Sequence, residues 1–438
     1  MGYKQKILPL RSQSHIKDAR LISRLENLLP DLMQETGIDM WIVTSQESNE
    51  DPVMKTMLPS PMLTSGRRTI LVYYLKDDKT VELISISKPG FAPAKFYNSV
   101  WVSQKGQDWG QFAKLSPDKG ITQGNVGEPE TQMECLKRII DERSPKNIGL
   151  NYCQTTAFGD GISHGTFELI CEGIGEDNAA KIVSAADLCV RWLETRLPDE
   201  IEALRGVVAL GADILHEALS TNVIHPGITT AADLEWWAMQ RCTDLGLRPW
   251  FPYMAALRRK GAVGLSGDVI ILEGDIIHFD IGFEYLGLCC DLQNNAYVLR
   301  RGETEAPQGI NDLFEKGKRF QDIAMGEIKL GRTGNEILKS SLGLAKKEGL
   351  DAMIYSHPLG THGHAAGPSI GGVDNQKFLE GNGERRINDN TCYALELNVS
   401  GPIPEWDGQS LMLGIETDIV FSGGVTEFLY RQDTLILV

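Results

Sequence analysis

The sequence has no run of about 18 apolar residues, the length at which a transmembrane helix is expected. Its eight cysteines contain no CxxC pair and no zinc-ribbon spacing. Basic residues are in the minority, with 43 Lys and Arg against 59 Asp and Glu, so that the net charge is −16. These shortages argue against a membrane partner, a zinc ribbon and a nucleic-acid partner. Scattered cysteines in a long chain are mostly buried, reduced thiols, and we therefore expect a cytoplasmic protein.

The length of 438 residues favours two domains over one core. Residues 15–37 have helical periodicity, and Gly37 is expected to end that helix. Residues 132–142 form another helical pattern, and short apolar runs typical of strands lie around it: Met40–Val43, Thr69–Leu75, Val81–Ile86 and Ile148–Leu150. This alternation predicts a smaller α/β domain over residues 1–190.

Residues 191–438 are predicted to form an α+β domain, with a curved antiparallel sheet covered by helices. Helical periodicity covers residues 201–219, 233–245 and 310–329. The expected strands are Val269–Leu272, Ile276–Ile281, Ala296–Leu299, Cys392–Val399 and Ile415–Phe421.

Two pairs of acids lie in these apolar strands, where they require an explanation. A tight turn over residues 284–287 would place Asp280 opposite Asp291, and a loop centred near Trp406 would place Glu396 opposite Glu416. Facing Cβ atoms are about 4.5–5.5 Å apart, so that paired carboxylates repel unless they share a proton or a cation. A single strand acid usually faces solvent, but four that converge suit one or two divalent cations.

Three of the eight histidines fall within residues 356–367, namely His357, His362 and His364. An isolated histidine is usually a surface or core residue. Three histidines beside glycines, which let backbone approach a ligand, favour a metal-binding or catalytic loop.

The order and spacing of these groups resemble the M24 family, the creatinase/aminopeptidase or pita-bread fold. That family has an Asp in an apolar-D-[IF]-G strand, a second Asp eleven residues later, a His in G-H-x-x-G and two Glu in later strands. The matching residues here are Asp280, Asp291, His364, Glu396 and Glu416. The N-terminal half resembles the creatinase-type domain that precedes the catalytic domain in Xaa-Pro aminopeptidases and prolidases.

The resemblance implies that these five residues bind two divalent metal ions, with manganese or cobalt expected first and zinc or iron as alternatives. A hydroxide bridging the metals would attack the scissile amide, and Glu396 would shuttle its proton. The resemblance also implies a homodimer.

Two departures from the family concern its other histidines. The family peptidases carry a substrate-contacting His before the first Asp, but residues 250–267 contain none. Arg258 and Arg259 stand there instead, either as a solvated loop or as a clamp for a substrate carboxylate. A second family His lies seven residues after the metal His, where this chain has Gly371 if His364 is the ligand.

His357 or His362 could replace the second family histidine as an acid or oxyanion donor, and either could equally lie behind the ligands. His362 is also the alternative ligand to His364, which is preferred because Gly363 and Gly367 flank it.

Three functions stay open on this basis. The first is an Xaa-Pro aminopeptidase or dipeptidase. The second is a metal-dependent hydrolase or lyase with a small non-peptide substrate, favoured by the missing histidines and the arginines. The third is a metal-free binding module, which the complete ligand set disfavours.

Overall fold

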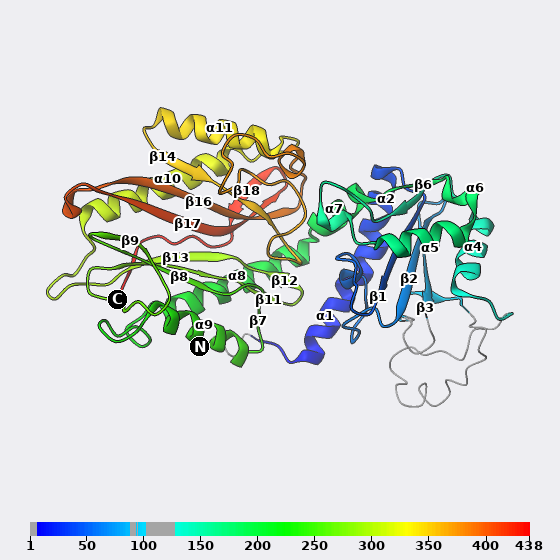
Figure 1. The fold of residues 1–438 in the computed structure, drawn as a ribbon, viewed down its shortest axis with the longest axis horizontal. Helices are drawn as coiled ribbons and strands as arrows, with labels where there is room; N and C mark the ends of the chain where they lie inside the picture. The colour runs from blue at the N-terminus through cyan, green and yellow to red at the C-terminus, as the bar shows by residue number, and fades with distance from the viewer. Residues whose placement is uncertain (1–6, 88–92, 94, 102–127) are drawn as a thin grey trace. The chain divides into compact units, whose positions relative to one another are not determined.

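The computed structural model describes residues 7–87, 93, 95–101 and 128–438 (Figure 1). It divides into two compact units, one of residues 9–193 and one of residues 194–438 with Ile7 and Leu8. The predicted domain limits at residues 190 and 191 stay a prediction. No described helix combines the length and the apolar character needed to cross a membrane.

The first unit contains a six-stranded mixed sheet in the order β4-β3-β2-β1-β5-β6. The pairs β1–β2 and β2–β3 are antiparallel, and the other pairs are parallel. All four strands that the apolar runs predict are present. The bounds are β1 (Met40–Gln46), β2 (Arg68–Leu75), β3 (Val81–Ser87), β4 (Asn98–Ser99), β5 (Ile148–Leu150) and β6 (Ile182–Ser184).

The first helical segment of this unit runs without a break from residue 10 to residue 36. Its middle part, Arg24–Leu28, is a π-helical turn. Gly37 ends the segment with φ of 68°, as predicted, because a glycine adopts this left-handed conformation without steric cost. The helices are α1 (Leu10–Ser23), α2 (Leu29–Thr36), α4 (Gln132–Arg143), α5 (His164–Ile174), α6 (Glu176–Ala179) and α7 (Ala186–Glu194).

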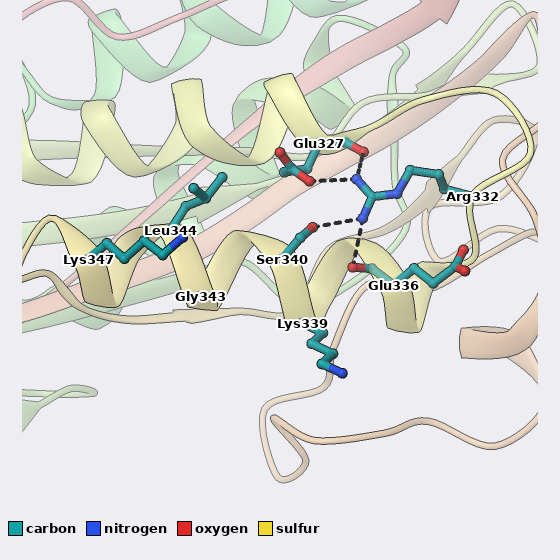
Figure 2. Close-up of a pocket in the computed structure, with 8 residues that line it drawn as sticks. All are labelled: Glu327, Arg332, Glu336, Lys339, Ser340, Gly343, Leu344 and Lys347. Atoms are coloured by element: carbon teal, nitrogen blue, oxygen red, sulfur yellow. Dashed lines mark hydrogen bonds and ion pairs between the residues drawn. The ribbon is translucent and has the colours of Figure 1, made fainter.

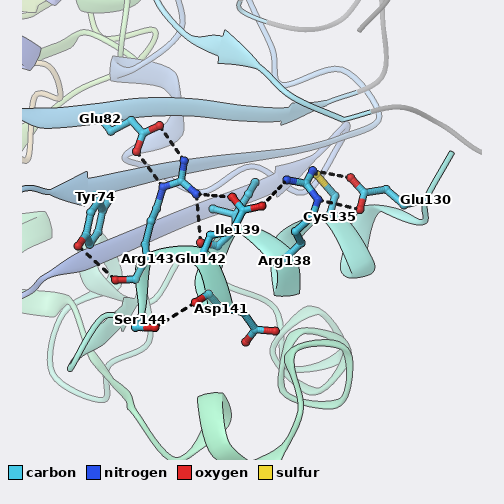
Figure 3. A network of polar contacts seen from close by, with 10 residues as sticks. All are labelled: Tyr74, Glu82, Glu130, Cys135, Arg138, Ile139, Asp141, Glu142, Arg143 and Ser144. Carbon is cyan, nitrogen blue, oxygen red and sulfur yellow. Dashed lines mark hydrogen bonds and ion pairs between the residues drawn. The ribbon is translucent and has the colours of Figure 1, made fainter. Parts of the chain in front are cut away.

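Helix α4 is linked to strand β3 of this sheet by Arg143, and Arg138 of the same helix forms further ion pairs (Figure 3). Arg143 makes two hydrogen bonds of 2.8 Å to the Glu82 carboxylate of β3. Arg138 bonds to Glu130 at 2.7 Å and to Glu142 at 3.2 Å. The bidentate geometry favours these pairs, and both arginine charges are balanced within the unit.

The second unit contains a ten-stranded sheet whose main path is β14-β16-β17-β13-β10-β8-β9. Its pairs are antiparallel except β13–β19, and β7 (Arg248–Pro249), β11 (Phe283–Tyr285) and β12 (Leu288–Cys289) form a separate small sheet. The predicted α+β class is confirmed. The bounds are β8 (Met254–Arg259), β9 (Ala262–Leu265), β10 (Ile276–Ile281), β13 (Leu292–Tyr297), β14 (Asp351–Ile354), β15 (His357–Leu359), β16 (Thr391–Ile403), β17 (Gln409–Ser422), β18 (Val425–Phe428) and β19 (Ile436–Leu437).

Helices cover one face of this sheet and leave the other face to polar side chains. α8 (Pro198–Ala218) contacts β10 and β13, α9 (Ala231–Asp244) contacts β8, and α10 (Gln308–Glu327) contacts β16 and β17 (Figure 1). α11 (Gly334–Lys347) packs on α10 and β14. Ile277 and Phe279 are buried in the core under α8, and Leu395 and Ile415 in the core under α10. Because side chains alternate along a strand, their neighbours point to the opposite face.

The predicted strand at residues 269–272 is wrong. Only Ile270 forms an isolated bridge, to Thr230. The backbone N–H groups of Gly227 and Ala231 donate to carbonyls of this segment, so that it pairs with the loop before α9 rather than with the large sheet.

Candidate metal centre

The two aspartates lie on one hairpin, and its turn consists of Leu286 and Gly287, with φ of 56° and 76°. This turn pairs Asp280 with Gln293. The prediction that Asp280 faces Asp291 is therefore wrong by two residues, because the turn comes later than expected. A shift of two residues keeps each side chain on its face of the sheet, so that Asp291 becomes a diagonal neighbour of Asp280.

The second predicted pair is confirmed, since Glu396 of β16 pairs with Glu416 of β17. Glu416 also pairs with Gln293 of β13, which in turn pairs with Asp280 of β10. One row across four adjacent strands thus contains Asp280, Gln293, Glu416 and Glu396, in that order. We call it the acidic row.

A histidine enters this region from β15. His357 pairs with Ala394, two residues from Glu396, and so lies over the same face. Its Nε2 atom is 3.4 Å from Asp291 Oδ2 and 3.9 Å from Glu416 Oε1. The imidazole therefore lies among the carboxylates.

Six side chains of this region form three overlapping groups, and within each group the ligand atoms lie within 4.8 Å of one another. Asp291, Glu416 and His357 each belong to two groups, which is the arrangement expected if adjacent cations share ligands. The groups are Asp280 with Asp291 and Glu416; His357 with Glu396 and Glu416; and Asp291 with His357 and His364.

Burial raises the pKa of each of these carboxyls. Asp280, Asp291 and Glu416 are 6%, 3% and 3% exposed. Loss of hydration holds their pKa values well above the ordinary range, and neighbouring carboxylates add to the effect on Asp280 and Glu416. Burial raises the pKa of Glu396 to about 7. Acids so placed are compensated either by protons or by cations.

Three buried atoms of the cluster have no hydrogen-bond partner among the described residues: Asp280 Oδ1, Glu416 Oε1 and His357 Nε2. Burial lowers the pKa of His357, which favours the neutral imidazole that binds metals. Carboxylate oxygens and an imidazole nitrogen form a donor set for divalent manganese, iron, cobalt or zinc. The residues present thus fit the metal that the sequence predicts.

The structure favours His357 over His364 as the ligand among the acids. His364 is exposed, and its ring centroid lies 4.4 Å from that of His357 and 5.2 Å from that of Trp250. Gly363, which suggested a ligand loop, serves packing instead: a Cβ there would lie 2.2 Å from the Trp250 ring. His364 stands seven residues after His357, the spacing that the family shows between its metal His and its second His.

His362 is outside these groups, with its Nδ1 atom 3.3 Å from Thr361 Oγ1. Arg259 also lies apart from the cluster. Its guanidinium bonds to both carboxylate oxygens of the buried Asp275, at 2.6 and 2.7 Å, and its position on β8 directs it away from the acidic row.

Arg258 is placed differently from its neighbour. It pairs with Ile276 of β10 in the register that pairs Met254 with Asp280, so that it shares the face of the acidic row. Arg258 is half-buried, and burial lowers its pKa. Within the described part of the chain no carboxylate forms an ion pair with Arg258, and its one hydrogen bond runs from Nη1 to the Leu257 carbonyl at 3.4 Å.

Sequence reasoning misses two polar residues of this face, Gln293 and Asp418. Asp418 is fully buried, and one of its oxygens accepts a hydrogen bond of 3.1 Å from the backbone N–H of Asp291. Burial holds its pKa well above the ordinary range. Gln293 follows Asp291 by two residues and Asp418 follows Glu416 by two, so that strand alternation applied to the known acids was the signal that would have found both.

A surface groove of about 550 Å³ lies elsewhere, along α11 beside the C-terminal end of α10 (Figure 2). Arg332 in this groove bonds to the Glu327 carboxylate at 2.5 Å and to Ser340 at 2.9 Å. Its charge is therefore balanced, and no residue of the metal cluster lines the groove.

Solved structures with the same fold identify this sheet as a pita-bread sheet preceded by an α/β domain. An X-Pro aminopeptidase from Thermotoga maritima MSB8 is 16% identical, with a TM-score of 0.62 over 93% of this chain and 100% of that one. An Xaa-Pro dipeptidase from Bacillus anthracis is 15% identical, with a TM-score of 0.58 over 97% and 100%. Dipeptidase PepE from Mycobacterium ulcerans is 14% identical, with a TM-score of 0.60 over 97% and 98%.

The sequence also matches a family profile directly. The protein belongs to metallopeptidase family M24, whose profile matches residues 202–422. That range includes the acidic row and the histidine loop, and the predicted family is confirmed. No curated protein matches the sequence. The predicted homodimer and cytoplasmic location stay predictions.

Proposed function

We propose that the protein is a metal-dependent peptidase of the Xaa-Pro aminopeptidase or dipeptidase type. The observation that carries this proposal is the convergence of four carboxylates and one imidazole on one face of the sheet, in a chain of family M24. The substrate class rests on the likeness of fold to an X-Pro aminopeptidase and an Xaa-Pro dipeptidase.

In this proposal the metal ligands are Asp280, Asp291, Glu396, Glu416 and His357. Two divalent ions, with manganese or cobalt preferred for so many carboxylates, would supply an activated water and polarise the scissile carbonyl. Glu396 takes the proton of the attacking water and passes it to the leaving amine. Glu396 suits this role because it alone among the four carboxylates is not fully buried.

We assign His364 a role at the substrate rather than at the metal. It is exposed beside His357, where its ring N–H can donate to the carbonyl oxygen as negative charge develops there. His357 thus changes from a candidate acid to a ligand, and His362 keeps no role at the reacting atoms.

Arg258 is the group we expect to bind a free carboxylate of the substrate. An arginine that has no acidic partner among the described residues, and that lies on the face of the acidic row, is suited to a substrate anion. This favours dipeptides over longer peptides. It equally favours the second candidate function, hydrolysis of a small non-peptide amide that carries a carboxylate.

The first test is cleavage of Xaa-Pro dipeptides, Xaa-Pro-Yaa tripeptides and a dipeptide without proline, after loading with manganese, cobalt or zinc. We expect metal-dependent cleavage of the proline substrates. Asp291→Asn, which keeps the shape of the side chain but removes its charge, should lower kcat/KM by at least about 100-fold. The exposed acid Glu315 provides the control variant Glu315→Gln, which should be fully active.

Two outcomes would contradict the proposed function. No cleavage of any peptide by protein that holds about two metal ions per chain would favour the non-peptide substrate. Equal activity of Asp291→Asn and the Glu315→Gln control would show that the acidic row is not the catalytic site.

Arg258→Met retains the apolar stem and removes the guanidinium. We expect it to raise KM for an Xaa-Pro dipeptide by about 10-fold or more, the effect of losing a charge-assisted hydrogen bond of about 1.5–3 kcal/mol, while KM for the corresponding dipeptide amide stays the same. Steady-state kinetics on the matched pair of substrates measures this difference, with Arg258→Lys as the charge-retaining control. An equal rise in KM for both substrates would argue against carboxylate recognition.

A further inference from the structure

Gln293 occupies the centre of the acidic row although an amide is not an acid. It pairs with Asp280 on one side and with Glu416 on the other. It is 4% exposed, so that both ends of its carboxamide need partners within the protein or a ligand.

The amide nitrogen of Gln293 bridges two metal-binding carboxylates. Nε2 donates to Asp280 Oδ2 and to Glu396 Oε1, both at 3.1 Å. Asp280 is on β10 and Glu396 on β16, with β13 and β17 between them. The side chain therefore spans the row past Glu416 and holds its N–H groups where a cation would be bound.

The other end of the same carboxamide is buried without a partner. Gln293 Oε1 accepts no hydrogen bond from any described residue. A Cβ added at Gly414 would lie 3.4 Å from this oxygen and 2.8 Å from His278 Cε1, so that the glycine leaves room beside the amide. A buried carbonyl oxygen without a donor is costly, and its presence here indicates a ligand.

The two ends of the amide respond to a cation in opposite ways. A cation held by the group of Asp280 or by the group of Glu396 would repel the positive end of the amide dipole and attract its oxygen. The last torsion of a glutamine side chain is broad and roughly two-fold, so that the carboxamide can exchange its ends without moving the backbone. A neutral carbonyl oxygen suits hard cations such as Mn²⁺ more than Zn²⁺, which prefers four ligands.

We propose that Gln293 is an additional oxygen ligand of the metal centre, and that it biases the site toward manganese over zinc. In the metal-free protein the N–H groups of Gln293 hold Asp280 and Glu396 together. On metal binding the amide turns, and Oε1 takes the place of the N–H groups and faces the metal. The proposal rests on the metal centre of the proposed function, but not on the peptidase reaction.

The test is metal binding by Gln293→Met, which has similar length and volume without an amide. Affinities for Mn²⁺ and Zn²⁺ are measured by competition with a chelator, and the visible absorption of the Co²⁺-loaded protein reports the coordination number. We expect Gln293→Met to weaken Mn²⁺ binding by about 10-fold or more, to leave Zn²⁺ binding less affected, and to intensify the Co²⁺ absorption as one ligand is lost.

Gln293→Glu is the matched second variant, because it keeps an oxygen at the same place and loses the N–H groups. It should bind Mn²⁺ at least as tightly as the natural protein and keep its Co²⁺ spectrum. The proposal fails if Gln293→Glu behaves like Gln293→Met, or if Gln293→Met weakens Mn²⁺ and Zn²⁺ equally with an unchanged Co²⁺ spectrum. Gln293 would then only position the two carboxylates. These readouts are independent of substrate, and so of whether the protein cleaves proline peptides.

Discussion

Two histidines seven residues apart have different environments, and on this difference rests our proposal that one binds the metal and the other the substrate. His357 lies among Asp291 and Glu416, whereas His364 is exposed beyond it. Partial burial of the ring and, to a smaller extent, the nearby His357 together lower the pKa of His364 to about 4. A neutral His364 ring in that position can donate a hydrogen bond through its N–H to the substrate carbonyl oxygen, while His357 serves as the metal ligand.

We therefore predict opposite phenotypes for the two alanine variants. His357→Ala should bind metal at least about 10-fold more weakly, as the loss of a ligand requires. His364→Ala should keep its metal and have a kcat about 100-fold lower, a decrease typical of the loss of one oxyanion donor. Metal content measured by mass spectrometry alongside kcat separates the two effects.

His362→Ala serves as the control for this pair and should match the natural protein in both measurements. Loss of metal from His364→Ala together with full metal content in His357→Ala would restore His364 as the ligand and reverse the assignment.

At the level of strands, the sequence predicts the hairpin β16–β17 correctly because both strands are long apolar runs around one loop. The hairpin β10–β13 is harder for two physical reasons. Leu286 adopts a positive φ, which a bulky residue rarely does. The sequence therefore gives no sign that Leu286 lies in the turn. Gln293, Asn294 and Asn295 are buried in β13 although such residues seldom form buried strands, so that β13 begins earlier than the predicted strand.

For the site, the face of the sheet on which a side chain lies is therefore easier to predict than the residue opposite it on the neighbouring strand. The acids Asp280 and Asp291 are placed on the correct face by alternation alone, whatever the register. Which residue lies opposite Asp280 depends on the turn, and for that reason the pairing of Gln293 with Asp280 is known only from the structure, although alternation from Asp291 places Gln293 on the same face. His357 is a candidate site residue from the sequence, but its place among the acids follows only from the pairing of β15 with β16.

At the scale of the whole molecule, the buried acids make the stability of the metal-free protein depend on pH. Burial raises the pKa of Glu396 to about 7 and holds those of Asp280, Asp291 and Glu416 higher than normal. Such a group stabilises the fold fully below its unfolded pKa and loses that contribution as the pH rises through its folded pKa. Each proton that the folded state alone retains costs about 1.4 kcal/mol per pH unit.

We predict that the free energy of unfolding of the metal-free protein falls by at least about 1.5 kcal/mol between pH 6.5 and pH 8. The ordinary histidine pKa of 6.5 lies at the lower limit of this window, so that His278, His357 and His364, whose pKa values burial lowers, oppose the fall near pH 6.5 and lose this effect as the pH rises. Saturating Mn²⁺ should abolish the fall, because cations replace protons as the compensating charge. Urea denaturation at the two pH values, with and without metal, measures both quantities.

Glu416→Gln tests whether the acidic row causes this dependence. The variant removes one titrating group and should weaken the fall in the metal-free protein by up to about 1.4 kcal/mol per pH unit, while Glu315→Gln, at an exposed acid, should leave it unchanged. Buried Asp418 has a raised pKa too, so that Asp418→Asn should act in the same direction as Glu416→Gln, although it belongs to none of the three metal-binding groups. A metal-free protein that is equally stable at both pH values would mean that the row keeps its acids ionised without a cation, and the electrostatic case for a metal centre would be lost.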